Sequence, residues 1–477
     1  MPARIPVTAA VSPTVRGRLA RALALSCCVG TLGISGCVFA PSAYTRPDPH
    51  LRDDARPMQV DASKRWWATA YDTTLVALID EALARNQDIH VALGRIQEAR
   101  AEVLRSEQTN LPSASLQLSA DRGRTPPANL FAPANTLYGR AQISYELDLW
   151  QRYASRQRAS ASQAQAAVFD AQALHLTLIG EVAAAYYSLH TTRRLTALAV
   201  ERRALLARAL AISRAQLKQG ASTWFDVETR QQQLTAAEVD ERAVSAEAKN
   251  QGIALATLLG RDPNDLRNVI SSGEVEVIDA EQRQPAAGIS ADVVLRRPDV
   301  LAAEQRLMAA HDDVEAARRA YLPTIDLAAF AGKLVSSTVT GTIPFRVWDL
   351  GASLAQPIFN TRSLDADLDG ARARRTEALA LYSKTVTQAV SETLQALIDC
   401  NRNFASRTDA GRQVAIAKAQ LQRTKQAMAV GRQAESQLIA AQLQLIDRKK
   451  DDEIALRDAR LGEVNLMRAA GGAIAAR

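Results

Sequence analysis

Residues able to do chemistry are few and scattered in this chain of 477 residues. The histidines His50, His90, His175, His190 and His311 show no spacing typical of metal ligands. The sequence contains no nucleophile elbow, phosphate-binding loop or zinc-helix motif, and no paired carboxylates in a catalytic setting. We therefore expect a protein that is not an enzyme and that holds no metal ion and no dissociable cofactor.

One cysteine has a context that predicts covalent modification. Residues 1–21 are basic and lack acidic side chains, residues 22–35 are apolar and small, and Cys37 follows directly after Ser35 and Gly36. This order is typical of a secretory leader that ends in a lipobox, where the thiol is lipidated after cleavage. We expect a signal peptide at 1–36, a covalent lipid on Cys37, and an extended lipidated tether at 37–60. An ordinary signal peptide that happens to contain a cysteine is the alternative.

Two sequence features indicate the destination and the fate of the remaining thiol. Val38 follows Cys37, and by resemblance to lipoprotein sorting signals the lack of an aspartate there favours the outer membrane. A lipid anchor of several acyl chains would hold the chain firmly at that membrane. Cys400 is the cysteine that stays free in the mature chain, and we expect it to be a small buried apolar residue.

Charge and hydropathy exclude two classes of function. The chain has 58 Lys and Arg against 51 Asp and Glu, and four of the arginines lie in the leader, so the net charge falls from +7 to +3. This balance argues against a nucleic-acid partner. Beyond the leader, no apolar run reaches the roughly 18 residues that a spanning helix needs, which excludes a helical membrane transporter.

The chain repeats itself with an offset of 211 residues. Residues 110–112 match residues 321–323 at a shared Leu-Pro, and Gly220 and Gly260 match Gly431 and Gly471. We expect a first repeat at 61–260, a linker at 261–290, a second repeat at 291–472 and a short tail at 473–477. Each repeat should contain a helix, two strands, a very long helix, a turn and a further helix.

The long helices are the clearest structural prediction. Residues 151–217 contain no proline and one glycine, and an alanine-rich apolar stripe follows steps of three or four along them. A helix of that length spans about 100 Å, which predicts a coiled coil or a helical tube rather than a globular domain. The other expected helices cover residues 74–108, 224–259, 362–430 and 435–470.

Four segments alternate as strands do. Residues 141–148 and 348–355 alternate between apolar and polar, with weaker strands around 116–118 and 325–331 and turns expected at 122–137 and 333–346. The pattern is typical of strands that cross a bilayer in a barrel, and a sheet packed on helices is the alternative. The aromatic residues Tyr138, Trp150, Tyr321, Trp348 and Phe359 bracket the expected strands and suit interfacial girdles.

Four strands cannot close a barrel, and open sheet edges are not tolerated in lipid. Several chains must therefore combine their strands. A trimer would supply about twelve strands and a matching ring of helices.

Several motifs resemble those of the TolC-like outer-membrane factors, in particular the NodT-type lipoproteins of tripartite efflux systems. The most specific is the stretch 295–300, Leu-Arg-Arg-Pro-Asp-Val, and the resemblance covers about residues 61–472. Further matches lie at Trp66-Trp67, Asn86-Gln87-Asp88-Ile89, the stretch 145–150 and Gln356-Pro357-Ile358-Phe359. The resemblance implies a mixed α and transmembrane β fold: a homotrimer whose twelve-strand β-barrel continues into a long periplasmic α-helical barrel.

The resemblance also implies partners and a function. A periplasmic adaptor and an inner-membrane pump, most often of the proton-driven RND class, would complete a tripartite assembly. We expect this chain to be its exit duct in the outer membrane, passing small toxic compounds from the periplasm to the outside. A duct for type I secretion or for metal efflux shares the fold, because fold does not decide cargo. A structural lipoprotein that spans the periplasm without a pore is the alternative of another class.

A periplasmic gate is the last implication of the resemblance. In the family, acidic residues just past the glycines at the helix turns form a constriction, and Asp226 occupies that place after Gly220. Three copies of Asp226 around a narrow axis would form a negative ring that favours cations, and solvated charges on a helix face are the alternative. Glu228 and Arg230 lie beside Asp226.

The second repeat departs from this acidic pattern. Past Gly431, Gln437 and Ala440 stand where the family tends to carry aspartate, with Arg432 and Glu435 close by. We therefore expect the charge of the gate to come mainly from the first repeat. The stretch 297–299, Arg-Pro-Asp, is interpreted as a helix start, with proline in the first turn and aspartate near the positive helix end.

Overall fold

The computed structural model describes residues 43–47, 67, 73–123, 134–264, 291–338, 341–359 and 361–472. The chain divides into two units, Met1–Arg46 and Pro47–Arg477, and the architecture below belongs to the second. The predictions for the signal peptide, Cys37, Trp66, the tail, most of the tether and most of the linker lie outside the described residues.

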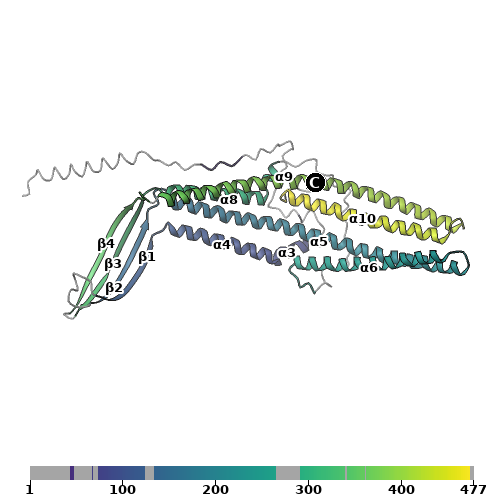
Figure 1. The fold of residues 1–477 in the computed structure, drawn as a ribbon, viewed down its shortest axis with the longest axis horizontal. Coiled ribbons are helices and arrows are strands. Elements are labelled where there is room, and N and C mark those ends of the chain that lie inside the picture. The colour runs from purple at the N-terminus through teal and green to yellow at the C-terminus, as the bar shows by residue number, and fades with distance from the viewer. Residues whose placement is uncertain are drawn as a thin grey trace, which may run out of the picture. The chain divides into compact units, whose positions relative to one another are not determined.

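The helices and strands of the described residues occur twice in the same order (Figure 1). The first copy comprises α3 (Thr73–Arg85), α4 (Gln87–Thr109), β1 (Ser113–Gly123), β2 (Ala134–Glu146), α5 (Arg152–Lys218) and α6 (Trp224–Leu258). The second comprises α7 (Ala291–Leu295), α8 (Pro298–Arg319), β3 (Thr324–Thr338), β4 (Gly341–Ala355), α9 (Thr361–Ala429) and α10 (Glu435–Ala469). The two very long helices and the helices that follow them are confirmed to within a residue at each end.

The helical part is built around the two long helices. With 67 and 69 residues, α5 and α9 each span about 100 Å. Helices α4 and α6 follow one another along α5, whereas α8 and α10 follow one another along α9 (Figure 1). Contacts of α5 with α8 and α10 join the two copies. None of the described helices is both long enough and apolar enough to span a membrane.

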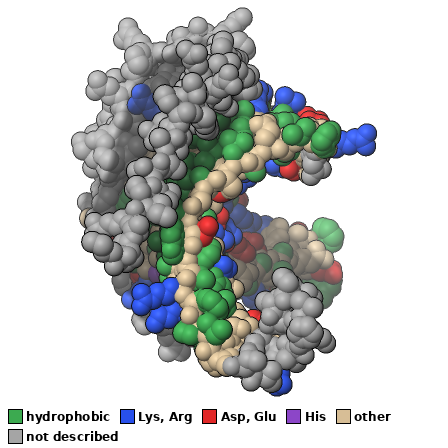
Figure 2. Space-filling model, turned by 90° about the vertical axis from the view of Figure 1, so that its left-hand side faces the viewer, with side chains coloured by type: hydrophobic (Ala, Val, Ile, Leu, Met, Phe, Trp, Pro, Cys, Tyr) green, Lys and Arg blue, Asp and Glu red, His purple; other side chains and the backbone are tan. Residues whose placement is uncertain are grey.

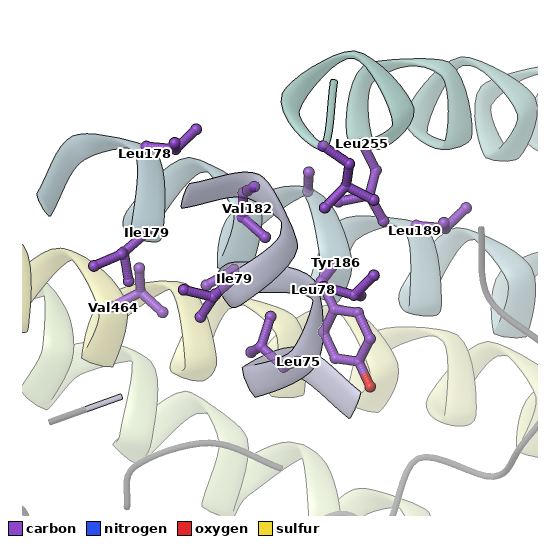
Figure 3. Close-up of a cluster of buried hydrophobic side chains, with 14 of the residues drawn as sticks. Leu75, Leu78, Ile79, Leu178, Ile179, Val182, Tyr186, Leu189, Leu255 and Val464 are labelled. Carbon is purple, nitrogen blue, oxygen red and sulfur yellow. The ribbon is translucent and has the colours of Figure 1, made fainter. Parts of the chain in front are cut away.

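The main core lies where residues of the two copies meet (Figure 3). Leu75 and Ile79 of α3 pack there against Tyr186 of α5, Leu255 of α6 and Val464 of α10, and all five are at most 2% exposed. Complete burial of such a side chain contributes about 2 kcal/mol. This cluster therefore fixes the relative positions of the long helices.

Two residues 211 positions apart each begin one helix and donate a hydrogen bond to the end of another helix. Asn86, the N-cap of α4, accepts the N–H of Asp88 and donates through Nδ2 to the Leu258 carbonyl at the end of α6 (3.0 Å). Arg297, the N-cap of α8, donates through Nη1 to the Ala469 carbonyl at the end of α10 (3.0 Å). In each copy, the residue that starts one helix thus satisfies a terminal carbonyl of another. The predicted continuous helix over 74–108 is wrong at Asn86, whose extended backbone and capping side chain divide it.

The four strands form one antiparallel sheet in the order β1-β2-β3-β4. The register places Leu116 opposite Ala141, Ala141 opposite Ala331, and Ala331 opposite Trp348, so the predicted apolar positions of all four strands share one face. Leu116 is 83% exposed and Trp348 is 78% exposed. This exposure argues against a sheet whose apolar face packs on helices of the same chain.

The strands are longer than their alternation predicted. Strands β3 and β4 remain paired up to Thr338 and Gly341, so the turn expected at 333–346 is wrong. The turn expected at 122–137 is too long at both ends, because β1 continues to Gly123 and β2 begins at Ala134. Pairing of β3 with β4 continues through Lys333 and Arg346, whose charges interrupt the apolar pattern.

The aromatic residues do not all bracket the strands. Trp150 and Tyr321 lie just outside β2 and β3, and Phe359 follows β4. Tyr138 and Trp348 instead lie inside β2 and β4, so the bracketing prediction is wrong for these two. The cause is again the additional strand length, since the local alternation ends before the backbone pairing does.

Cys400 is buried on α9, as predicted, and packs beside Leu466 and Ala469 of α10. Burial raises the pKa of its thiol to about 11, and the charge of Glu463 adds to the shift. We expect N-ethylmaleimide at pH 8 to modify Cys400 at least about tenfold more slowly in the folded protein than in urea, because the thiolate is the reactive form. Mass spectrometry of timed samples would measure both rates, and equal rates would contradict this burial.

Candidate functional site

The candidate site extends from the sheet, along the long helices, to the turns at their far ends. A cluster of polar side chains joins the end of β2 to the start of α5. Tyr153 donates its hydroxyl proton to Glu146 at the end of β2 (2.6 Å), and Arg152 donates to the same carboxylate (2.5 Å). Asp148 accepts the N–H of Ala154 (2.9 Å), which caps the start of α5. Trp150 and the next residues are thereby held between β2 and α5.

The junction also contains an unusual backbone conformation. Gln151, the N-cap of α5, has φ 60°, which is rare for a residue other than glycine. Arg319, at the end of α8, donates to the Gln151 carbonyl (2.9 Å) and also contacts Ser155. Burial raises the pKa of Tyr153, and its bond to Glu146 raises it further. These contacts make the connection from sheet to helix rigid.

The second face of the sheet is more polar than the apolar one. It carries Arg140 of β2, whose Nε donates to Gln117 of β1 (2.8 Å). The guanidinium lies 5.4 Å from the ring centres of both Tyr138 and Phe330, within the range of a cation–π contact. Viewed from the end where the strands turn, the molecule shows hydrophobic side chains along the sheet with groups of Lys and Arg near them (Figure 2). The two faces thus differ in chemistry, as a wall between lipid and water requires.

The far ends of the helical hairpins lie at two glycines. Gly220 (φ 75°) follows α5 and Gly431 (φ 73°) follows α9, and both adopt the left-handed conformation that glycine tolerates best. The N–H of Ala221 bonds to the Gln216 carbonyl (2.8 Å), which closes the first helix end. Both predicted tip glycines therefore lie at helix reversals.

Asp226 has a structural role at the first tip. Its Oδ2 accepts from the backbone N–H of Thr223 (2.9 Å), from the Thr223 hydroxyl (2.6 Å) and from the Ser222 hydroxyl (3.2 Å). The Thr223 hydroxyl in turn accepts the N–H of Asp226, which completes a capping box at the start of α6. The bonds from Thr223 lower the pKa of this exposed carboxyl. Asp226 therefore carries a firmly held negative charge on the surface of the tip.

The other gate candidates divide into exposed residues and one paired residue. Glu228, Arg230, Arg432 and Gln437 are exposed, and Arg230 donates to Gln233 within α6 (2.9 Å). Glu435 forms an ion pair with Arg208 of α5. Glu435 thus helps to join the two hairpins, and its negative charge is partly neutralised.

The pair at Glu435 is accompanied by further ion pairs between α5 and α10. Towards mid-length, Arg202 pairs with Asp447, and Arg194 pairs with Glu453 (3.7 Å). In these three pairs the arginine comes from α5 and the carboxylate from α10. The hairpins are therefore joined by ion pairs of one polarity, and a groove of about 670 Å³ between α5, α6 and α10 lies beside them.

The residues that sequence reasoning missed are Thr223, Ser222 and Arg208. The pattern of Thr223 followed three positions later by Asp226, at the start of a helix, is a capping signal that could have predicted the box. The pairing of Arg208 with Glu435 had no such signal, because it joins residues far apart in the chain.

Comparison with known proteins gives consistent results. A family model described as outer membrane efflux protein matches residues 78–261 and 290–472. The outer membrane protein OprJ of Pseudomonas aeruginosa is 30% identical over 392 residues, covering 79% of this chain and 80% of OprJ. The solvent efflux pump outer membrane protein SrpC of Pseudomonas putida is 27% identical over 387 residues, covering 80% of each chain. The crystal structure of a membrane protein from Pseudomonas aeruginosa has a TM-score of 0.77 at 26% identity, covering 91% of this chain and all of that one.

Proposed function

The chain belongs to the outer membrane efflux protein family, and we propose that it forms the outer-membrane exit duct of a tripartite efflux pump. The observation that carries this proposal is the sheet. It has one exposed apolar face and one polar face, and within the described residues β1 and β4 each pair with a single strand. Both outer edges are thus available to neighbouring copies. Three copies would close a barrel of about twelve strands with the polar faces around a lumen.

The long helices support the remainder of the conduit. In a homotrimer, six helices of about 100 Å with their partner helices would continue the barrel as a tube through the periplasm. A lipid on Cys37 would anchor each chain to the outer membrane. The turns of the two strand hairpins would then lie outside the cell, and the Gly220 and Gly431 turns would lie at the periplasmic end.

The tip has surface suitable for a protein partner. Trp224 and Phe225, directly before Asp226, are 73% and 76% exposed. Large exposed aromatic side chains next to each other mark interaction sites. We assign this surface to the periplasmic adaptor, which would connect the duct to an inner-membrane pump of the RND class.

The proposed cargo rests on the name of one relative. The name of SrpC says that it serves a solvent efflux pump, which favours small amphiphilic compounds as cargo of this chain. Among the described residues no group of His, Cys, Asp and Glu is arranged to hold a metal ion. A duct of this kind needs no chemistry of its own, because the partner pump supplies the energy of transport.

Accumulation assays in a strain that lacks this protein test the proposed function. Amphiphilic dyes, organic solvents and toxic metal salts would be compared with and without the intact gene on a plasmid. Greater accumulation of dyes and solvents, reversed by the gene, would support drug-type efflux. Greater accumulation of metal salts alone would move the assignment to metal efflux, and unchanged levels of all of them would contradict the proposal.

Two variants separate the charge of the gate from the capping of the tip. Asp226→Asn removes three negative charges from the trimer, whereas Thr223→Ala removes the capping partner and leaves those charges in place. We expect Asp226→Asn to reduce the preference for K⁺ over Cl⁻ several-fold in planar bilayers. Thr223→Ala should leave that preference unchanged and destabilise the tip by about 1 kcal/mol. An unaltered conductance and cation preference in Asp226→Asn would end the gate assignment.

The same charge gives a pH dependence. The pKa of Asp226 is lowered in the folded chain, so its ionisation favours the folded tip at any pH above the unfolded value near 4. This contribution is lost only when the pH falls through the lowered folded value. Cation preference carried by Asp226 should consequently be the same at pH 7 and pH 5.

A further inference from the structure

Two basic residues lie within the apolar rows of the sheet's apolar face. Lys333 of β3 and Arg346 of β4 are directly opposite one another in the register, and both are exposed. On the other side of Lys333, the facing residue of β2 is Gly139, which offers no side chain. No carboxylate of the described residues forms an ion pair with either cation. Like charges opposite each other destabilise a sheet, so an anion bound between them would stabilise this part of it.

The rows on either side of the pair are apolar. Ala331 and Trp348 face each other in the row towards the helices, and Val335 and Pro344 face each other in the row towards the turn. Beyond them, Ser337 opposite Thr342 begins a polar level. The pair therefore lies inside the apolar band, one row from its outer edge.

The depth of the pair can be estimated from strand geometry. Lys333 is eight residues from Ile325, which is about 27 Å along the strand and about 20 Å along the membrane normal at a tilt near 40°. The apolar band of such barrels is about 25 Å tall. From this depth the flexible side chains of Lys333 and Arg346 reach the headgroup layer. Trp348 lies one row closer to the centre of the apolar band.

We propose that Lys333 and Arg346 bind the phosphate groups of a phosphorylated lipid in the outer leaflet. This inference rests on the proposed function, which directs the apolar face to lipid and the β3–β4 turn to the outside. Arg346 supplies a planar fork suited to two phosphate oxygens, and Lys333 supplies a point charge. The apolar rows accommodate the acyl chains of the same molecule, which is why a lipid, and not free phosphate, is the ligand.

Native mass spectrometry of the detergent-purified trimer would test this site with lipid A as the probe. Lipid A carries two phosphates, and phosphatidylcholine at the same concentration serves as the lipid of no net charge. We expect the wild-type trimer to retain lipid A in preference to phosphatidylcholine. The double variant Lys333→Gln with Arg346→Gln should bind lipid A roughly 25-fold more weakly, about fivefold for each cation.

A matched control removes the same charge elsewhere. Lys384 and Arg423 of α9 are exposed, and the variant Lys384→Gln with Arg423→Gln should bind lipid A as the wild type does. The exchange variant Lys333→Arg with Arg346→Lys keeps both cations and should keep most of the binding. Equal lipid A binding by the wild type and the Gln variant would overturn the proposal, as would complete displacement of lipid A by millimolar inorganic phosphate.

Failure of the site and failure of the duct give different results. If the lipid site alone is wrong, the wild type still forms a trimer that conducts across bilayers of pure phosphatidylcholine. Lipid A binding is then the same with and without the charges of Lys333 and Arg346. If the duct assignment is wrong, no trimer forms and no conductance appears in any lipid. In that case the lipid proposal is overturned with it.

Discussion

Arg297→Ala should lower the free energy of unfolding by about 2 kcal/mol, because it removes a buried cation whose hydrogen bonds join three helices. Arg297 donates to both carboxylate oxygens of Asp299 (3.0 and 2.7 Å) and to Glu392 of α9 (2.8 Å). It also bonds to the Ala469 carbonyl at the end of α10, which would lose this donor. Thermal unfolding of the purified protein, followed by circular dichroism, would measure the change.

Exposed arginine pairs provide the control for this prediction. Arg372 pairs with Asp369 one turn away on α9, and both side chains are more than half exposed. Such a pair contributes less than about 0.5 kcal/mol, so Arg372→Ala should unfold near the wild-type temperature. Arg297→Lys keeps the charge without the fork and should lie between the two. Equal loss from Arg297→Ala and Arg372→Ala would refute the role assigned to Arg297.

Arg297 also shows where sequence interpretation stopped. The helix-start interpretation is confirmed, since Pro298 opens α8 and Asp299 lies in its first turn. That interpretation uses only neighbours in the chain. The bonds from Arg297 to Ala469 and Glu392 join residues 172 and 95 positions away, and no local pattern predicts them. Asn86, the equivalent residue of the first copy, donates to the Leu258 carbonyl in the same way. Once either contact is known, the internal repeat predicts the other.

The long helices and the apolar face could be predicted because each follows from a period that the chain repeats many times. Strand length could not, because backbone pairing continues past the last alternating residue. Lys333 and Arg346 ended the predicted strands, yet both lie several residues inside the observed ones. A charge interrupts a hydrophobic pattern without removing the backbone groups that form the ladder.

The candidate gate residues were chosen by resemblance and position, and their contacts required the structure. Asp226 was expected beyond Gly220 and lies there, but all three bonds described above end on one of its carboxylate oxygens. Glu435 was expected near the second turn and is paired with Arg208 of the other copy. Position along a helix thus predicted which residues reach the tip, whereas the partners depend on how the two hairpins pack.

Gly332→Val should have an effect of similar size on the sheet, about 3 kcal/mol, and should reduce formation of the proposed trimer. A Cβ at Gly332 would lie 2.2 Å from the carbonyl oxygen of Gly139 and 2.8 Å from the Cα of Arg140. Both are backbone atoms of β2, so relief of the clash must separate two paired strands. Native gel electrophoresis of the purified protein, with thermal unfolding of the trimer band, would measure the loss.

Gly351 of β4 makes the matching control, because it lies on the same face and a Cβ there would meet only the Asp349 side chain, at 3.7 Å. Valine also favours strands more than glycine does, so Gly351→Val should assemble at least as well as the wild type. The contrast between the two variants would show that the loss arises where β3 approaches β2, close to the contacts of Arg140 with Tyr138 and Phe330. Full assembly of Gly332→Val would mean that these strands separate easily, and the polar face could then not form a fixed wall around a lumen.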